Sequence, residues 1–471
     1  MTEILLGGGG ARTAALSPIA QPRARSTAIW ALAGIAMVLM LLSPALWNGF
    51  PLIFPDTGGY LDRPVHGTLG MGRSALYGAF LYPGVPFHFW PNIILQSAMM
   101  VWLIVLSLRT HGLGGRPGLA LGIVALLTVA TSAPWFAAQL MPDILFAAAA
   151  LALHLLVFRS DALQRWERWT LAAVIVFAMP SHMALAGMCV GIVIALALLK
   201  LALKTWPALG LPQPRLTFAA TAVAAGIAMC PVSNYAVTGQ FALTPGGSSF
   251  LVGRLVEDGI VIRYLNDKCP DPTIRLCAFT ASNFPTDADW WLWDGDSPFR
   301  KLQNFEGSAE EKALVTETMK LYPVAHFFAA VRASAEQMVK FATEISVKHN
   351  GPTIEMMRVH TPKLWPQLMQ ARQQVEKFDV GVLNPVHVPV AGFAMVCLVA
   401  ALAFRQRLGL PPPLAAFAVS VMLALAANAV ICGVFSHAVD RYQSRLVWLA
   451  PLAVAMIAAW LYRQRAEPAA N

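Results

Sequence analysis

The feature that most constrains this chain is a series of long apolar segments that are almost free of charged residues. A helix needs about 20 mostly apolar residues to cross the hydrocarbon layer of a membrane. Only 13% of the 471 residues are charged, whereas soluble domains carry about 25%. We therefore predict a mainly α, polytopic membrane protein with about ten transmembrane helices. The expected spans lie near residues 28–47, 88–108, 117–133, 141–158, 170–182, 183–203, 216–235, 386–404, 413–434 and 446–462.

The distribution of Lys and Arg predicts how these helices are oriented. Short cytoplasmic loops of membrane proteins carry an excess of both residues. With a cytoplasmic N-terminus, 15 of the 34 basic residues fall in cytoplasmic segments and four in the opposite short loops. Both termini are then cytoplasmic, in an inner (plasma) membrane protein. The net charge of +9 therefore indicates orientation, and no nucleic-acid partner is expected.

The same pattern divides the chain into segments. One long stretch, residues 239–384, has the composition of a soluble protein, and we expect it to form an extracytoplasmic domain between the seventh and eighth spans. The full prediction is a disordered cytoplasmic tail at 1–27, a seven-span module at 28–238 with a first outside loop at 48–87, the domain at 239–384, three spans within 385–463, and a cytoplasmic tail at 464–471.

Within the outside domain, Cys269 and Cys277 are the only cysteines expected outside the lipid. In an oxidising compartment this spacing predicts a disulfide that closes a small loop, and two unlinked thiols are the alternative. Residues 324–344 have apolar side chains at helical spacing, which predicts an amphipathic helix against the core or the membrane face. The neighbouring tryptophans are either a sugar-stacking surface or an aromatic core: Trp290, Trp291 and Trp293.

A second group of ionisable residues lies at the outer membrane boundary. It comprises four acids and four arginines outside the long domain: Asp56, Asp62, Asp143, Asp440, Arg63, Arg73, Arg441 and Arg445. Ionisable groups at membrane depth are costly and usually mark a pathway or a site. We therefore expect a site that faces outward.

Asp56 begins the most informative motif, because it lies on a Pro/Gly-shaped turn just after the first span. Such a carboxylate can accept a proton from a hydroxyl group or hold a divalent cation. If a helix starts at Thr57, Tyr60 lies on the same side as Asp56. The alternative is that Asp56 is an ordinary helix N-cap.

Asp143 and His182 each have a structural and a functional interpretation. Asp143 follows Pro142 where the fourth span begins, which suits a helix N-terminus, but an acid here also points toward the outer vestibule. His182 lies at a helix break, where it is either a structural histidine or a site residue.

The last outside loop carries Arg441 and Arg445, four residues apart and therefore on one face of a helix. Two guanidiniums make a good clamp for a phosphate group. Alternatively, they are snorkelling arginines with Asp440 as partner and an aromatic belt at Tyr442 and Trp448.

These motifs resemble the GT-C class of integral membrane glycosyltransferases. In that class the first outside loop often carries Asp-x-x-x-Tyr, which Asp56 and Tyr60 match. Asp143 matches a further acid near the start of a later span, and Arg441 and Arg445 match basic residues near the lipid phosphate. A soluble domain after the seventh span is also common. Thr57 stands where some members have a second acid, which argues against metal dependence. A divalent cation is the one cofactor that the resemblance allows.

The resemblance implies an inverting hexosyl- or pentosyltransferase that uses a polyprenyl-phosphate sugar at the outer face. Asp56 would be the general base, with Asp143 as a second catalytic acid. The implied partners are a lipid-linked sugar donor, membrane lipids, and a glycolipid, polysaccharide or protein acceptor of the cell envelope. The substrate-binding residues expected are Tyr60, Asp62, Arg63, Arg73, His182, Arg441, Tyr442 and Arg445.

The alternative function is a polytopic transporter or lipid flippase for an envelope precursor. Transporters usually place ionisable residues near the bilayer midplane and contain repeated halves. The predicted spans are almost free of charge at mid-depth and the sequence has no evident repeat, so the transferase is favoured.

Overall fold

The computed structural model describes residues 24–243, 246–279, 284, 286–344, 351–375 and 379–466. These residues are mainly helical and contain no β-strand, as the sequence predicts. The first element, α1 (Ala24–Asn48), includes the end of the predicted N-terminal tail. The rest of that tail and residues 467–471 of the C-terminal tail lie outside the described residues.

Seven of the described helical segments are long and apolar enough to cross a membrane. This makes the chain a helical membrane protein. Two of these segments extend beyond a single helix, because a short 3-10 helix, η7 (Val380–Leu383), precedes α20, and α22 (Asp440–Val447) leads into α23. The long helices are α1, α4 (Trp90–Thr110), α9 (Met183–Thr205), α10 (Leu216–Thr238), α20 (Asn384–Ala403), α21 (Pro412–Phe435) and α23 (Leu449–Ala466).

The other three predicted spans form shorter helices. They are α5 (Pro117–Ala130), α7 (Ile144–Phe158) and α8 (Arg165–Ser181), with 14, 15 and 17 residues. At about 1.5 Å per residue, each is shorter than a hydrocarbon layer about 30 Å thick. The predicted count of ten is therefore larger than the seven that meet the length requirement.

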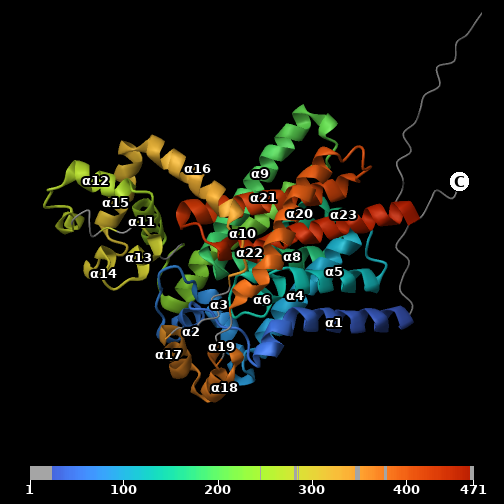
Figure 1. The fold of residues 1–471 in the computed structure, drawn as a ribbon, viewed down its shortest axis with the longest axis horizontal. Helices are drawn as coiled ribbons and strands as arrows, with labels where there is room; N and C mark the ends of the chain where they lie inside the picture. The colour runs from blue at the N-terminus through green and yellow to red at the C-terminus, as the bar shows by residue number, and fades with distance from the viewer. Residues whose placement is uncertain are drawn as a thin grey trace, which may run out of the picture.

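Helix α7 explains why its segment has such a continuous apolar sequence. All of its residues from Ile144 to Val157 are buried, because α4, α8, α10 and α21 surround it. The break between α8 and α9 lies at His182, as predicted, where the backbone is extended. Figure 1 shows these helices side by side in one bundle.

The described residues of the predicted outside domain form two lobes at the same end of the bundle (Figure 1). The first lobe has its own core, which includes Trp291 and Phe305. It comprises α11 (Gly247–Glu257), α12 (Ile260–Lys268), η4 (Arg275–Ala278), α13 (Ala288–Trp293), α14 (Pro298–Lys301), α15 (Ala309–Leu321) and α16 (Pro323–Val339). The second lobe comprises α17 (Gly351–His360), η6 (Pro362–Leu364), α18 (Trp365–Gln370) and α19 (Arg372–Val375).

The second lobe packs on the first outside loop, where α17 lies against α2 (Thr57–His66). That loop also contains α3 (Ala75–Leu81) and η1 (Tyr82–Phe87). The remaining short helices join the long ones: α6 (Ala133–Ala137), η2 (Ser160–Ala162) and η3 (Pro207–Leu209).

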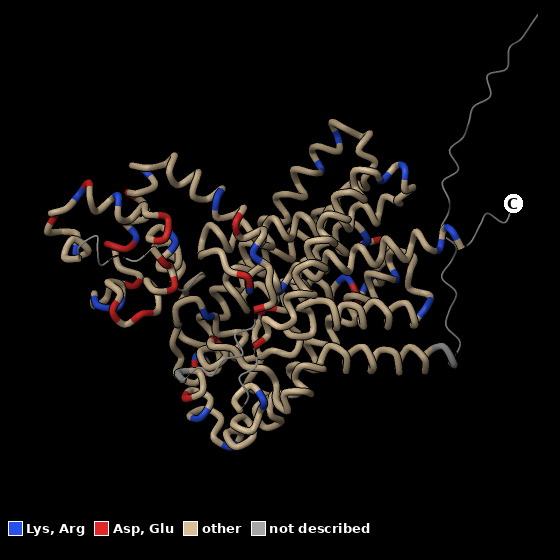
Figure 2. Tube along the Cα trace, in the orientation of Figure 1, with Lys and Arg blue, Asp and Glu red and all other residues tan. Residues whose placement is uncertain are grey.

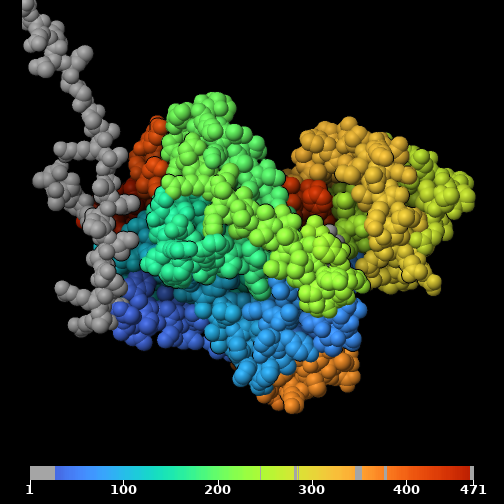
Figure 3. Space-filling view, turned by 180° about the vertical axis from the view of Figure 1, so that it is seen from behind, coloured from blue at the N-terminus to red at the C-terminus, as the bar shows by residue number. Residues whose placement is uncertain are grey.

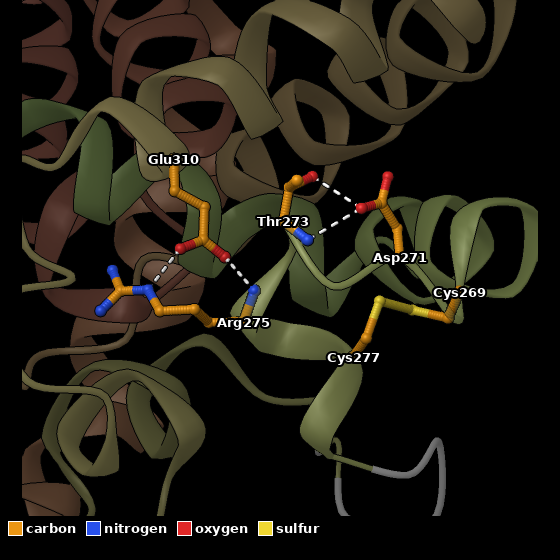
Figure 4. The surroundings of a disulfide bond; sticks show 6 residues. All are labelled: Cys269, Asp271, Thr273, Arg275, Cys277 and Glu310. Carbon is orange, nitrogen blue, oxygen red and sulfur yellow. Dashed lines mark hydrogen bonds and ion pairs between the residues drawn. A yellow bond between two sulfur atoms is a disulfide. The ribbon is translucent and has the colours of Figure 1, made fainter.

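In the first lobe, Cys269 and Cys277 are joined in a disulfide (Figure 4). The bond links the end of α12 to η4. Two polar interactions lie beside it: Asp271 accepts hydrogen bonds from Thr273, and Arg275 Nε lies 2.6 Å from Glu310 Oε2. The disulfide therefore joins η4 to α12, and the ion pair joins η4 to α15.

Charge is distributed unevenly along the bundle. Figure 2 shows acids and bases together in the first lobe, whereas the opposite ends of the long helices carry mostly Lys and Arg. This arrangement agrees with the asymmetry of the short loops in the sequence.

The predicted amphipathic helix at 324–344 ends earlier than expected, at Val339. It packs closely along α21, yet Phe327 and Phe328 remain 63% and 65% exposed. Of the apolar residues at helical spacing in this segment, Met338 and Phe341 pack against the main core, whereas Val331 is exposed.

Candidate active site

A cavity of about 1200 Å³ lies where the membrane helices meet the first lobe. Apolar side chains of α9, α10 and α21 form one wall, and residues of α11, α13 and α15 line the other. Figure 3 shows a hollow between the green α9 and α10 and the yellow-to-gold first lobe. Seven of the predicted site residues line the cavity: Asp56, Tyr60, Arg73, His182, Arg441, Tyr442 and Arg445.

Asp56 directly precedes α2, as predicted, but its side chain does not cap that helix. It instead forms an ion pair with Arg73, and one of its oxygens lies 3.7 Å from Arg441 Nη1. Thr57 fixes this turn, because its hydroxyl accepts a hydrogen bond from Phe54 N and donates one to Leu140 O. The Asp56 carboxylate is therefore held at the cavity wall by two guanidiniums.

Arg441 links the two candidate catalytic acids. Besides Asp56, it contacts Asp143, with 2.7 Å between Arg441 Nη2 and Asp143 Oδ2. One turn further along α22, Arg445 Nη1 lies 3.0 Å from the other oxygen of Asp143. Because the two arginines are four residues apart on one helix face, both form ion pairs with the same acid, Asp143. Asp440 is not their partner, because it accepts a hydrogen bond from Ala342 N.

Asp143, predicted as a second catalytic residue, lies behind the two arginines. Its side chain is wholly buried, both of its oxygens accept from arginines, and it does not line the cavity. A buried carboxylate of this kind is held ionised by its guanidinium partners. In this position Asp143 holds the guanidiniums of Arg441 and Arg445 in place.

The arginines also lie on aromatic rings. The guanidinium carbon of Arg441 is 3.7 Å from the ring centre of Phe54, and that of Arg445 is 3.3 Å from Phe146. These contacts fix the planes of both guanidiniums. The Nε atoms of Arg73, Arg441 and Arg445 are buried and have no hydrogen-bond partner among the described residues.

Three arginines and two aspartates leave this cluster with one excess positive charge. Burial would raise the pKa of Asp56, but the guanidiniums of Arg73 and Arg441 outweigh that effect and lower it below its ordinary value. Asp56 is therefore ionised at neutral pH. A partly desolvated cluster with excess positive charge favours an anionic ligand.

Two aromatic residues complete the predicted group. Tyr60 stacks edge-on against Tyr77 at 5.2 Å, and burial, together with the nearby charge of Asp56, raises the pKa of its hydroxyl. Tyr60 therefore stays protonated and can donate a hydrogen bond. The hydroxyl of Tyr442 lies 3.3 Å from Ser436 Oγ.

His182 was expected to be either a structural histidine or a site residue, and its surroundings have features of both. Its Nδ1 accepts a hydrogen bond from Ala184 N, which caps α9, and its ring lies edge-on to Phe146. The residue also lines the cavity. The structural interpretation explains its position, and access to the cavity leaves the ring able to contact a ligand.

Asp62 and Arg63 are not brought to the cavity. Asp62 accepts hydrogen bonds from His66 and His360, and Arg63 donates to Thr68. Each residue of an α-helix turns by about 100°, so Asp62 lies roughly 200° around α2 from Tyr60. Neither Asp62 nor Arg63 lines the cavity, so their expected role in binding a substrate there stays a prediction.

Two cavity residues that the sequence analysis did not consider are His437 and Asp289. His437 lies 3.3 Å from Asp289 and joins the last outside loop to the first lobe. Trp293 lines the cavity beside Arg73, whose guanidinium carbon is 5.7 Å from the indole ring centre. Of the three tryptophans considered, Trp291 is core and Trp293 faces the site.

The hydrogen bond between His437 and Asp289 favours the ionised form of both side chains. Burial alone would lower the pKa of His437, but its hydrogen bond to Asp289 raises it above the ordinary value. The same hydrogen bond lowers the pKa of Asp289. The proximity of His437 to Arg441 in the sequence was the one signal that could have identified it.

Comparisons with protein-family models, curated proteins and solved structures find no match to this chain. The residues of the cavity therefore carry the functional assignment.

Proposed function

We propose that this chain is a membrane glycosyltransferase that moves a sugar from a polyprenyl-phosphate donor to an acceptor hydroxyl in the cavity. The observation that supports this proposal best is that one cavity combines a wall of membrane helices with an ionised acid and excess positive charge. A substrate with a long apolar tail and an anionic head matches both parts.

In this proposal the lipid chain lies along the apolar wall. Val190, Ile227 and Phe435 contribute to that wall from α9, α10 and α21, which are all long enough to span a membrane. The donor phosphate lies by Arg73 and Arg441. The Nε atoms of both arginines lack a hydrogen-bond partner among the described residues, and a phosphate oxygen accepts from such donors.

Asp56 is the general base of the reaction. It removes the proton from the acceptor hydroxyl as that oxygen forms a bond with the anomeric carbon. The bond from that carbon to the donor phosphate breaks, and its electrons leave with the phosphate. Arg441 and Arg73 stabilise the charge that develops there, which is often the largest contribution to catalysis. The sugar is transferred with inversion.

The proposal also includes the membrane topology. The three short helices α5, α7 and α8 complete ten crossings, with both termini cytoplasmic and the two lobes outside. The cluster of Lys and Arg at the end of the bundle away from the lobes supports this orientation. The donor and the acceptor then meet at the outer face of the membrane.

The test is a comparison of envelope glycolipids and polysaccharides by mass spectrometry. Cells lacking the gene are complemented with the wild type, with Asp56→Asn, or with the control Asp161→Asn. Asp161 is an exposed acid that pairs with Arg215 far from the cavity. We expect one glycosylated species to be restored by the wild type and the control but not by Asp56→Asn.

Restoration by Asp56→Asn would remove Asp56 as the base. An unchanged glycome together with altered uptake of an envelope precursor would favour the transporter or flippase.

A further inference from the structure

A second cluster of ligand-type side chains lies on the face of α2 that points away from the cavity. It consists of Asp62, His66 and His360, and one ligand atom of each lies within 4.8 Å of the others. The Oδ1 atom of Asp62 is 2.8 Å from His66 Nδ1 and 2.9 Å from His360 Nε2. No other group of three such residues with this spacing occurs in the part of the chain that the structure describes.

The positions of the three residues follow from two helices. Asp62 and His66 are four residues apart on α2, which places them on one face of that helix. His360 is the last residue of α17, which packs against α2. The cluster therefore joins the second lobe to the first outside loop, two segments about 300 residues apart.

The surroundings of the cluster resemble those of a metal site with solvent access. The side chain of His360 is 6% exposed and that of Asp62 is 17% exposed, so the protein orders both of them. His66 is 58% exposed, which leaves one side open for an ion to enter and for a water ligand to bind. The two imidazole rings meet at 69°, and their centres are 5.3 Å apart.

The donor atoms define the class of ion. Two imidazole nitrogens and one carboxylate oxygen are a ligand set of Zn²⁺, with a fourth position for water. Ligand atoms of a tetrahedral zinc site are about 3.3 Å apart, given bonds of about 2.0–2.1 Å. Small side-chain rotations separate the observed donors to that distance. Mg²⁺ and Ca²⁺ prefer sites made of oxygen alone.

We propose that Asp62, His66 and His360 bind a divalent transition-metal ion of the zinc type, which ties α17 to α2. This site lies beyond the proposed transferase reaction and does not depend on it. Its consequence for the cavity is indirect. Helix α2 carries Tyr60 and directly follows Asp56, which both line the cavity, so a metal bound to Asp62 and His66 would hold the opposite face of the same helix.

The test uses the full-length protein in detergent, with its purification tag removed and bound metal stripped by a chelator. Calorimetric titration with Zn²⁺ should show one equivalent bound to the wild type. His66→Asn and His360→Asn should each weaken the affinity by at least about tenfold, because each removes one of three protein ligands. His88→Asn is the matched control, because His88 directly follows η1 and is not part of the cluster.

His66→Asn is the decisive variant, since its largely exposed ring can be removed without a cavity in the core. Zn²⁺ should raise the melting temperature of the wild type and of His88→Asn but not of His66→Asn. The proposal is overturned if the wild type binds no equivalent of Zn²⁺, or if His66→Asn binds as tightly as the wild type. In that case the two rings simply donate hydrogen bonds to Asp62. A comparable affinity for Mg²⁺ would overturn the assignment of the ion class.

Discussion

The guanidinium of Arg441 donates a 2.7 Å hydrogen bond to Asp143, an acid 298 residues earlier in the chain. The same guanidinium lies 3.7 Å from Asp56, so a single side chain connects a wholly buried acid to the acid at the cavity wall. The charge of the site thus depends on a residue that does not touch the cavity.

Removing the buried acid should therefore destabilise the protein as well as inactivate it. Asp143→Asn leaves the buried guanidinium of Arg445 without its ionic partner, and breaking a buried pair in this way costs about 3–5 kcal/mol. We expect a clearly lower melting temperature in detergent. Asp161→Asn, which removes an exposed partner of Arg215, should change the melting temperature little.

A double substitution separates charge from packing at this position. If Asp143→Asn acts by leaving Arg445 uncompensated, adding Arg445→Met should recover part of the lost stability. Equal melting temperatures of the single and double variants would contradict this explanation.

Arg73 should control the pH dependence of transfer through its effect on Asp56. Its guanidinium helps to lower the pKa of Asp56, and the proposed base acts only when ionised. Arg73→Met should raise that pKa and shift the acid limb of the pH–rate profile upward by about one unit. Arg168→Met, at an exposed position far from the cavity, is the control. If the acid limb does not shift in Arg73→Met, the ionisation that limits the rate is not that of Asp56.

The pair of His437 and Asp289 should make stability depend on pH in one direction. The folded-state pKa of His437 lies above its ordinary value of 6.5. Its contribution is therefore complete below about pH 6.5 and is lost as the pH rises through the raised pKa. Because Asp289 is 57% exposed, we expect the effect to be below about 1 kcal/mol.

Melting temperatures of the wild type and of His437→Gln, measured from about pH 5 to about pH 9, test this prediction. The two proteins should differ most near pH 6 and converge at high pH. If the difference in melting temperature instead grew as the pH rose, the predicted direction of the pH dependence would be wrong.

The disulfide of the first lobe should protect that lobe from local opening. Cys269→Ser removes a bond that closes a short loop, worth about 2–3 kcal/mol in the loop-entropy model. We expect faster proteolysis within the first lobe. Cys397→Ser, which changes a free cysteine in α20, should leave the cleavage rate unchanged. Equal rates in both variants would mean that the disulfide does not limit opening.

The parts of the site that the sequence predicts are those set by local spacing. Asp56 and Tyr60 share one side of α2, and Arg441 and Arg445 share one face of α22, because a turn of helix separates the members of each pair. The same geometry turns Asp62 away from Tyr60. The prediction grouped Asp62 with Asp56 by membrane depth and did not take this rotation into account.

Long-range pairing could not be predicted from spacing. The hydrogen bond between Arg445 and Asp143 joins residues 302 positions apart. No local pattern indicates that the acid at the start of α7 pairs with an arginine of α22. The division of residues 239–384 into two lobes is likewise set by packing, since α17 lies on α2 and not on the first lobe. Hydropathy identified α5, α7 and α8 as spans without regard to their lengths, so the predicted count of ten includes three helices that are shorter than the seven candidate spans.

The most direct test of the central claim is sugar transfer by the purified protein. The substrate is the lipid-linked sugar identified from the glycolipid comparison, and the variants are Asp56→Asn and Asp161→Asn. The account predicts that Asp161→Asn transfers at the wild-type rate, whereas Asp56→Asn binds the donor but transfers at least about 100-fold more slowly, as expected for loss of a general base. Transfer by a stably folded Asp56→Asn protein at the wild-type rate would contradict it.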